Sequence, residues 1–249
     1  MSTLPISVSA IVLVGLIGTT ATICVMLWRG ARGTGHGPRI AAVVAVIAGT
    51  SWATWVFANV VLAHVDVYRF APDKAQPWLP VAMVAALAAV LLATRVPVVS
   101  RILAEPHALW RLTVPQYFRV EGVVFLMAMA LGALPAGFAL PAGLGDIATG
   151  IGAVYVARSI RRGVVGRRAV WFNILGLLDL VVATTIGVAA APGVAHVLSL
   201  HPTTEQLALL PLVLIPTTVV PLAAALHVLS LRKIAVASKP ASVPTPIGA

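Results

Sequence analysis

Long uncharged apolar blocks dominate this sequence, and they limit the possible folds more than any other feature. A helix must place about 20 mainly apolar residues across the roughly 30 Å hydrocarbon layer of a membrane. Only 10% of the 249 residues are charged, against about a quarter in soluble domains. We therefore expect an all-α integral membrane protein. Six blocks reach the required length: 6–28, 40–65, 78–100 (interrupted by Arg95), 122–157, 169–191 and 206–231.

The fourth block is too long for one span. It contains Pro135 and Pro141 near its centre, and proline and glycine often mark turns between helices. We interpret it as a tight hairpin of two spans. The predicted domain, residues 1–235, is a bundle of seven transmembrane helices, followed by a disordered cytoplasmic tail at 236–249. The expected spans are approximately 6–28, 40–65, 78–100, 120–136, 141–157, 169–191 and 206–231.

Basic residues alternate between the connections that this count creates. They follow the first, third, fifth and seventh spans, whereas the second connection balances Arg69 and Lys74 with two aspartates. No lysine or arginine follows the fourth or sixth span. By the positive-inside rule the N-terminus lies outside and the C-terminus in the cytoplasm. The net charge of +10 therefore reflects topology, and we expect the lipid bilayer as a partner and no nucleic acid.

The amino-acid usage suggests a source. Arginine far outnumbers lysine, and Ala, Val and Gly are abundant, which is typical of GC-rich bacterial genomes. We expect a multi-pass protein of the bacterial inner membrane.

Two aspartates lie within predicted spans, where a charge is costly and therefore often functional. Asp179 is near the middle of its span, and Asp146 is about 7 Å inside the outer end of its own. Small residues three or four positions away indicate that both side chains point at other helices. We expect neither to have a basic partner at its depth. A difference of about 9 Å along the axis argues against direct pairing of the two carboxyls.

Other polar residues complete a predicted track across the bilayer. Asn59 lies toward the outside, Thr217 and Thr218 near the middle, and Asn173 toward the inside. With the two aspartates they form a ladder of exchangeable groups that suits protons or a small solute. The alternative is structural, because Ser and Thr in membrane helices often bond their own backbone.

Prolines interrupt the last span at three positions, Pro211, Pro216 and Pro221. Each removes a backbone donor and can kink the helix. We expect the freed carbonyls to be satisfied by threonine hydroxyls or water. Both a moving helix and a static kink fit this pattern.

The segment at the inner end of the fourth span carries a candidate gate. Arg119 and Glu121 could pair and unpair there, with Arg95 at the same predicted depth. The alternative is that residues 105–119 form an interfacial anchor, in which Arg119 extends toward the headgroups.

Cofactor and enzyme motifs are missing from the sequence. No phosphate-binding glycine loop, nucleophile elbow or His-Glu-x-x-His pair is present. We expect His227 to have a core or interfacial role, because a haem needs two histidines at matching depth. The outer histidines lie partly in a loop, and one cysteine excludes a disulfide. We expect no metal and no cofactor.

Three hypotheses for function remain open. The first is a small transporter or permease for protons or a small solute, with Asp179 as the binding or protonation group. The second is a sensor or assembly subunit whose basic loops bind partner proteins, and homo-oligomers fit it also. The third is an intramembrane enzyme that acts on lipid or quinone with Asp146 and Asp179 as acid and base. The missing motifs favour a protein that is not an enzyme.

Overall fold

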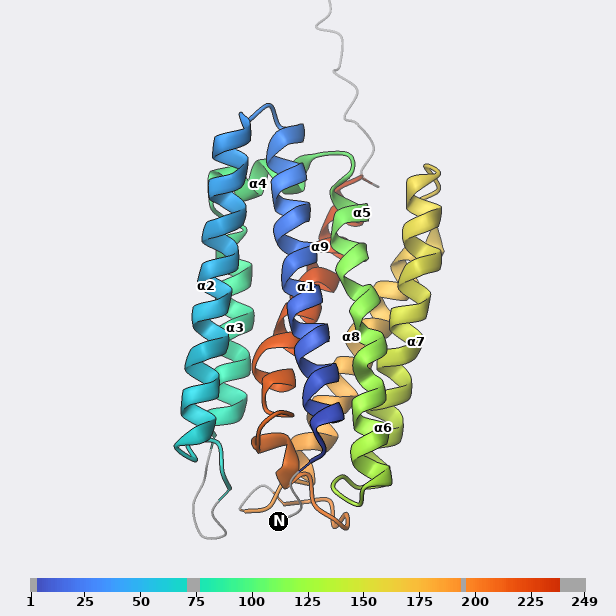
Figure 1. The fold of residues 1–249 in the computed structure, drawn as a ribbon. Coiled ribbons are helices and arrows are strands. Elements are labelled where there is room, and N and C mark those ends of the chain that lie inside the picture. Colours follow the sequence, from blue (N-terminus) through green and yellow to red (C-terminus); the bar gives the residue numbers. More distant parts are fainter. Residues whose placement is uncertain (1–3, 71–76, 194–195, 238–249) are drawn as a thin grey trace, which may run out of the picture.

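The protein is all-helical in the part of the chain that this computed structural model describes, residues 4–70, 77–193 and 196–237. No β-strand occurs in those residues, and the helices form one elongated bundle (Figure 1). η1 is a 3₁₀-helix and η3 a π-helix. The elements are α1 (Ile6–Gly33), α2 (Pro38–His64), α3 (Trp78–Ala93), α4 (Pro97–Ala104), α5 (Ala108–Thr113), η1 (Val114–Gly122), α6 (Val123–Ala130), α7 (Ala136–Arg161), α8 (Arg167–Ala189), η2 (Glu205–Ala208), η3 (Ile215–Val219) and α9 (Val220–Ala237).

Five helices among the described residues are long and apolar enough to cross a membrane. They are α1, α2, α7, α8 and the continuous helix Ile215–Ala237, which η3 and α9 form together. The bent pair of α3 and α4 is a sixth if it counts as one span. The all-helical class is therefore confirmed, and the apolar helices are compatible with a membrane protein. The count of seven spans stays a prediction, and the predicted tail lies outside the described residues from position 238 onward.

The third predicted span bends sharply near its end. The axes of α3 and α4 differ by 79°. The residue before a proline is driven out of the α conformation, and Val96 before Pro97 is accordingly extended, with φ −60° and ψ 128°. Arg95 lies exposed at this bend. As a result α4 runs across the end of the bundle (Figure 1), where Ile102 lies against Gly30 of α1.

The helical hairpin that follows turns earlier than the sequence suggested. α5, η1 and α6 follow one another without a break from Ala108 to Ala130, and α7 begins at Ala136. Gly132 makes the turn with a φ of 70°, a conformation that costs a residue without a Cβ little. Pro141, predicted to begin the second span, lies inside α7 instead. The observed helices therefore differ from the predicted limits 120–136 and 141–157.

The prolines of the last span produce an irregular helix, as expected. Pro216 lies inside η3, and Pro221 follows in the first turn of α9. Pro221 has no N–H to offer the carbonyl of Thr217, four residues earlier. The indole Nε1–H of Trp55 on α2 donates to that carbonyl at 2.9 Å. A side chain from another helix thus compensates for the missing backbone donor.

α7 is the element against which the middle of the bundle packs. Its glycines let η1 approach at backbone distance: a Cβ at Gly143 would lie 3.0 Å from the carbonyl oxygen of Gly122, and one at Gly150 would lie 2.7 Å from the amide nitrogen of Val120. A stripe of small residues permits close contact between membrane helices. This contact fixes the position of η1 relative to α7.

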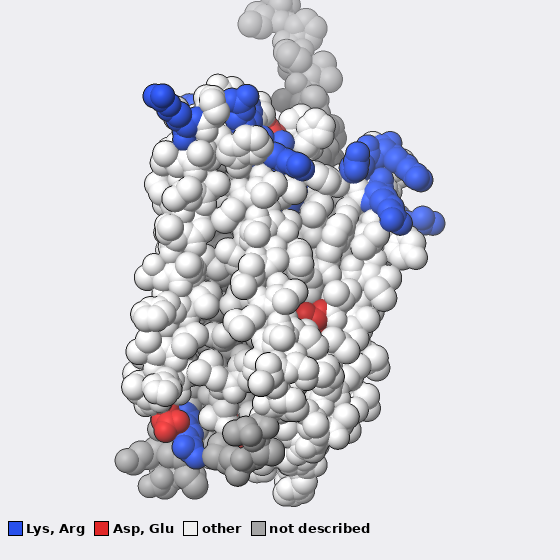
Figure 2. Space-filling model, in the orientation of Figure 1, with Lys and Arg blue, Asp and Glu red and all other residues white. Residues whose placement is uncertain are grey.

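Charged side chains gather at one end of the bundle. Figure 2 shows lysine and arginine over the end where α1 turns into α2 and α7 into α8, with a long band below them in which a single acidic side chain is visible. Asp66 and Arg69, an exposed pair with 3.5 Å between Oδ2 and Nη1, lie after α2. The described residues therefore divide into a basic end, an apolar middle and a nearly neutral end.

We predict that Gly150→Ala destabilises the fold, because the new methyl group would meet backbone atoms of η1 that cannot move aside. Overpacking of this kind costs about 1–3 kcal/mol. Gly152→Ala is the matched control on the same helix, since its Cβ would lie 3.6 Å from the Phe172 ring, an ordinary contact. Unfolding of both variants in detergent micelles measures the difference. Equal stability of the two variants would contradict the packing described here.

Candidate functional site

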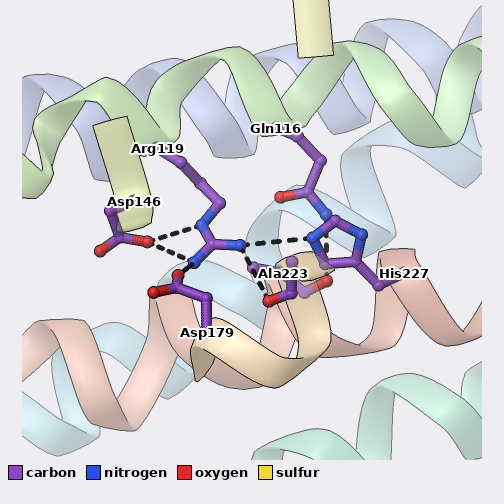
Figure 3. Close-up of polar contacts among 7 residues, drawn as sticks. Gln116, Arg119, Asp146, Asp179, Ala223 and His227 are labelled. Carbon is purple, nitrogen blue, oxygen red and sulfur yellow. Dashed lines mark hydrogen bonds and ion pairs between the residues drawn. The ribbon is translucent and has the colours of Figure 1, made fainter. Parts of the chain in front are cut away.

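A buried arginine organises the polar residues inside the bundle. Arg119 extends from η1, and its side chain is only 3% exposed. The five N–H donors of a guanidinium cannot be left unpaired away from water. Figure 3 shows that the residues around it come from α7, α8 and α9. Four helical segments therefore meet at one cation.

Two carboxylates share this guanidinium. Nε of Arg119 donates to Oδ1 of Asp146 at 2.6 Å, and Nη2 is 2.5 Å from the same oxygen. Nη2 also donates to Oδ2 of Asp179. The prediction that neither aspartate has a basic partner at its depth is therefore wrong, and the predicted separation along the axis is wrong with it.

The reason lies in the limits of two helices. α7 begins at Ala136 and not at Pro141, so Asp146 is ten residues into its helix and not five. Asp179 is likewise ten residues from the end of α8 at Ala189. At 1.5 Å per residue both carboxylates lie about 15 Å from the same end of the bundle, which puts them at equal depth.

Glycines make room for the members of this cluster. A Cβ at Gly145 would lie 1.8 Å from Oδ1 of Asp179, and one at Gly122 would lie 2.3 Å from Cβ of Asp146. A Cβ at Gly176 would lie 2.3 Å from Nε2 of His227. The glycines on these helix faces thus provide space for acidic and imidazole side chains as well as close helix contact.

His227 on α9 is fixed in one tautomer by its neighbours. Nδ2 of Asn173 donates to the carbonyl of Ala169 at 2.7 Å, which leaves Oδ1 of Asn173 as an acceptor. Nδ1–H of His227 donates to that oxygen at 2.9 Å. Nε2 is then an acceptor, and Nη1 of Arg119 donates to it at 3.3 Å and to the carbonyl of Gly176 at 3.3 Å. The imidazole is therefore neutral.

Glu121 lies next to the cluster without a partner. Its side chain is 9% exposed, and neither carboxyl oxygen has a hydrogen-bond partner among the described residues. It lies against α1, where a Cβ at Gly15 would overlap Oε2 at 1.1 Å. A void of about 10 Å³ lies between Glu121, Arg119 and Asp146, which is close to the space that one water molecule needs.

A much larger cavity approaches the same point from the end opposite the basic residues. Its volume is about 380 Å³, and its lining is almost entirely apolar. It extends from Phe70 and Pro77, beside the connection of α2 to α3, to Asp146. The small void and this cavity share five lining residues: Phe125, Asp146, Leu180, Ile215 and Val220. The cavity therefore ends at the ionic cluster.

The predicted gate is not formed as expected. Arg119 is buried and pairs with Asp146 and Asp179, while Glu121 has no hydrogen bond to it. The alternative, in which Arg119 extends toward the lipid headgroups as part of an interfacial anchor, is also wrong, because the side chain is buried in the bundle. Both errors follow from placing the start of the span at residue 120, whereas the helical segment begins at Ala108. Arg95 is exposed at the α3–α4 bend and does not join the cluster.

The structure brings only part of the predicted track to the cluster. Asn173 belongs to it through His227. The hydroxyls of Thr217 and Thr218 are buried and donate to carbonyls four residues earlier, as in the structural alternative. Asn59 accepts a hydrogen bond from the hydroxyl of Tyr68 at 2.6 Å, where the chain leaves α2.

Sequence reasoning missed His227 as a member of the site and missed the role of Arg119. One signal was available. Residues 108–130 are a further apolar stretch of spanning length once Arg111, Arg119 and Glu121 are allowed inside it. An arginine near the middle of such a stretch, as Arg119 is, with two aspartates in other spans, indicates internal neutralisation.

Comparison with known proteins identifies a family. The family model described as Domain of unknown function (DUF8737) matches residues 76–235, so the chain belongs to this family. No curated protein and no solved structure matches the chain. All members of the cluster, from Arg119 to His227, lie within the matched residues, whereas α1 and α2 lie before them.

We predict that Arg119→Gln is much more damaging than Asp179→Asn. The first change leaves two buried carboxylates without a cation, a loss of about 3–5 kcal/mol. The second leaves Asp146 to neutralise Arg119, and the new amide oxygen can still accept from Nη2. Adding Asp179→Asn to Arg119→Gln should therefore restore part of the lost stability. Unfolding in detergent measures this double-mutant cycle.

The control for this cycle is Asp66→Asn, which removes the exposed partner of Arg69. An exposed pair contributes at most about 1 kcal/mol, so this variant should unfold like the unmodified protein. Strictly additive effects of Arg119→Gln and Asp179→Asn would contradict the shared guanidinium.

Proposed function

We propose that this member of the DUF8737 family is a membrane transport protein that moves a small, mainly apolar solute in exchange for protons. The observation that supports this most is the cavity of about 380 Å³ that ends at Asp146, the carboxylate that shares Arg119 with Asp179. Its volume is within the usual range for small-molecule sites. A solute in it would contact an ionisable group in the middle of the bundle.

The balance of charge in the cluster favours a cationic solute. Three carboxyl groups, those of Glu121, Asp146 and Asp179, face one guanidinium, and His227 is neutral. With all three ionised the cluster carries two uncompensated negative charges. Buried charge must be neutralised, and either protons or a bound cation can do so. Competition between them for the same carboxylates is a direct means of coupling.

The topology that we propose with this function has seven spans, with the N-terminus outside and the cytoplasm at the basic end. Five long helices and the bent pair of α3 and α4 support six of these spans. The seventh is the segment that α5, η1 and α6 form together. The gathering of Lys and Arg at one end (Figure 2) supports the orientation, by the positive-inside rule. We place the protein in a bacterial inner membrane.

In this arrangement the cavity opens toward the outer half and the cluster lies at its inner limit. A cation that reaches Asp146 would weaken the hold of this carboxylate on Arg119. A proton held by the acid cluster would then be released. Glu121, with no other partner, is the acid best placed to exchange that proton through the small void.

A second function has some support from the same cavity. Its apolar lining also fits part of a lipid or quinone, with Asp146 as an acid or base within an intramembrane enzyme. The two functions differ in the fate of the ligand. A transported solute is recovered unchanged on the other side of the membrane, whereas an enzyme alters it.

The orientation predicts which connections a membrane-impermeant maleimide reaches in intact cells. In a Cys24→Ala background, Val197→Cys after α8, an 80% exposed position, should be labelled, and Arg162→Cys before α8 only after permeabilisation. The second pair flanks the segment formed by α5, η1 and α6. Leu131→Cys, after α6, should be labelled in intact cells, and His107→Cys, before α5, only after permeabilisation. If both cysteines of a pair were labelled in intact cells, the segment between them would not cross the membrane.

Transport predicts that Asp179→Asn abolishes solute movement and leaves a folded protein. Ethidium, a planar apolar cation, is the probe, and liposomes with an acidic interior and trapped DNA report its entry by fluorescence. The unmodified protein should accelerate uptake until the pH gradient is collapsed. Asp179→Asn should reduce the rate to that of protein-free liposomes, because one exchangeable carboxylate is lost.

Asp66→Asn is the matched control for this assay, since the same chemical change falls on an exposed loop. It should retain the full rate. Uptake by Asp179→Asn at the unmodified rate would refute the proposed role of the cluster. Chemical alteration of an added lipid or quinone, with no movement of ethidium, would favour the enzyme.

A further inference from the structure

A further cavity, of about 870 Å³, lies at the basic end of the bundle and shares no lining residue with the cavity or the void at the ionic cluster. Arg29 of α1, Arg161 of α7 and Lys233 of α9 line it, with α5 between them. No acidic residue is among its described lining residues. Three cations that line one hollow repel one another unless an anion lies between them.

The neighbouring groups leave these cations available. Glu105, the carboxylate whose charge acts on Lys233, is paired with Arg111. Nζ of Lys233 donates to the carbonyl of Ala104 at 2.6 Å, which holds the ammonium at the edge of the cavity and leaves two of its three N–H donors. The guanidinium of Arg161 lies 5.9 Å from the centre of the Trp110 ring. That contact orients the guanidinium without neutralising it.

Apart from His107, the remaining side chains that line the cavity are apolar. Leu109, Ile160 and Ile234 are among them, together with the Trp110 ring. Tryptophan is enriched at the level of the lipid headgroups. A ligand that fits must therefore carry negative charge at one end and hydrocarbon at the other.

We propose that this cavity, which we call the basic cleft, binds the phosphate headgroup of an anionic phospholipid. Arginine and lysine are the side chains that bind phosphate oxygens most strongly. Basic pockets between helices on the cytoplasmic side of membrane proteins suit such headgroups. The phosphate lies between Arg29, Arg161 and Lys233, and the first carbons of the acyl chains lie along the apolar wall. The site is independent of the proposed transport function.

Native mass spectrometry of the full chain tests this proposal. The protein is placed in nanodiscs of equal amounts of dioleoylphosphatidylglycerol and dioleoylphosphatidylcholine, and the lipids that remain bound after gentle release are counted. We expect phosphatidylglycerol to be retained well above its share of the bilayer. The double variant Arg161→Gln, Lys233→Gln should retain the two lipids in bulk proportion.

The control is Arg162→Gln with Arg232→Gln, which removes the same charge from the residues next to those two but outside the cleft lining. It should keep the enrichment of phosphatidylglycerol. Equal loss in both double variants would overturn the proposal, because it would show a general effect of surface charge. No loss in either variant would also overturn it.

Glycerol 3-phosphate distinguishes a lipid from a free phosphate ligand. A soluble phosphate site would bind this probe in detergent without lipid, and would show no preference for phosphatidylglycerol in nanodiscs. That outcome overturns the lipid assignment. Retention of phosphatidylglycerol in the presence of excess glycerol 3-phosphate supports it. Matching unfolding temperatures of the two double variants would show that differences in retention arise at the cleft.

Discussion

The neutralisation of one buried guanidinium is the constraint on which the rest of this structure depends. Arg119 lies in the middle of the bundle, where an unpaired charge costs several kcal/mol, a large part of the stability of a typical domain. Its partners come from α7, α8 and α9, so three helices must keep their depth and rotation for one cation to be satisfied. The close backbone contact between η1 and α7 at Gly150 holds the arginine in place. Packing and electrostatics therefore set the same geometry.

Hydropathy and charge predict the helical class because both can be read from short stretches of the chain, with no knowledge of the contacts between helices. The apolar blocks around α1, α2 and α8 have clear limits, and the observed helices extend a few residues beyond them into the basic connections. The error at 122–157 has a different origin. Both Gly132 and Pro141 can end a helix, and only the surrounding packing decides that the chain turns at the glycine. A shift of five residues at the start of α7 then changed the depth of Asp146.

Three members of the site were predictable from the sequence, whereas the contacts that join them to Arg119 and His227 were not. Asp146, Asp179 and Asn173 stand out because polar groups are rare in apolar spans. The partner of the two aspartates is not visible by this criterion. Arg119 ends a segment, residues 105–119, whose sequence resembles an anchor at the lipid headgroups. Its burial arises from contacts between residues 27 to 108 positions apart. No pattern within one helix carries information about such distances.

The π-helix η3 determines what the deletion of a single residue would do to this chain. A π turn holds one more residue than the α-helical turn it replaces, so η3 turns α9 by about 100° relative to the helix that would form without it. His227 reaches Arg119 in that rotated register. Loss of one residue between Ile215 and Val219 would give a more regular helix and turn His227 away from the guanidinium. In this part of the molecule, greater helical regularity and an intact ion cluster exclude each other.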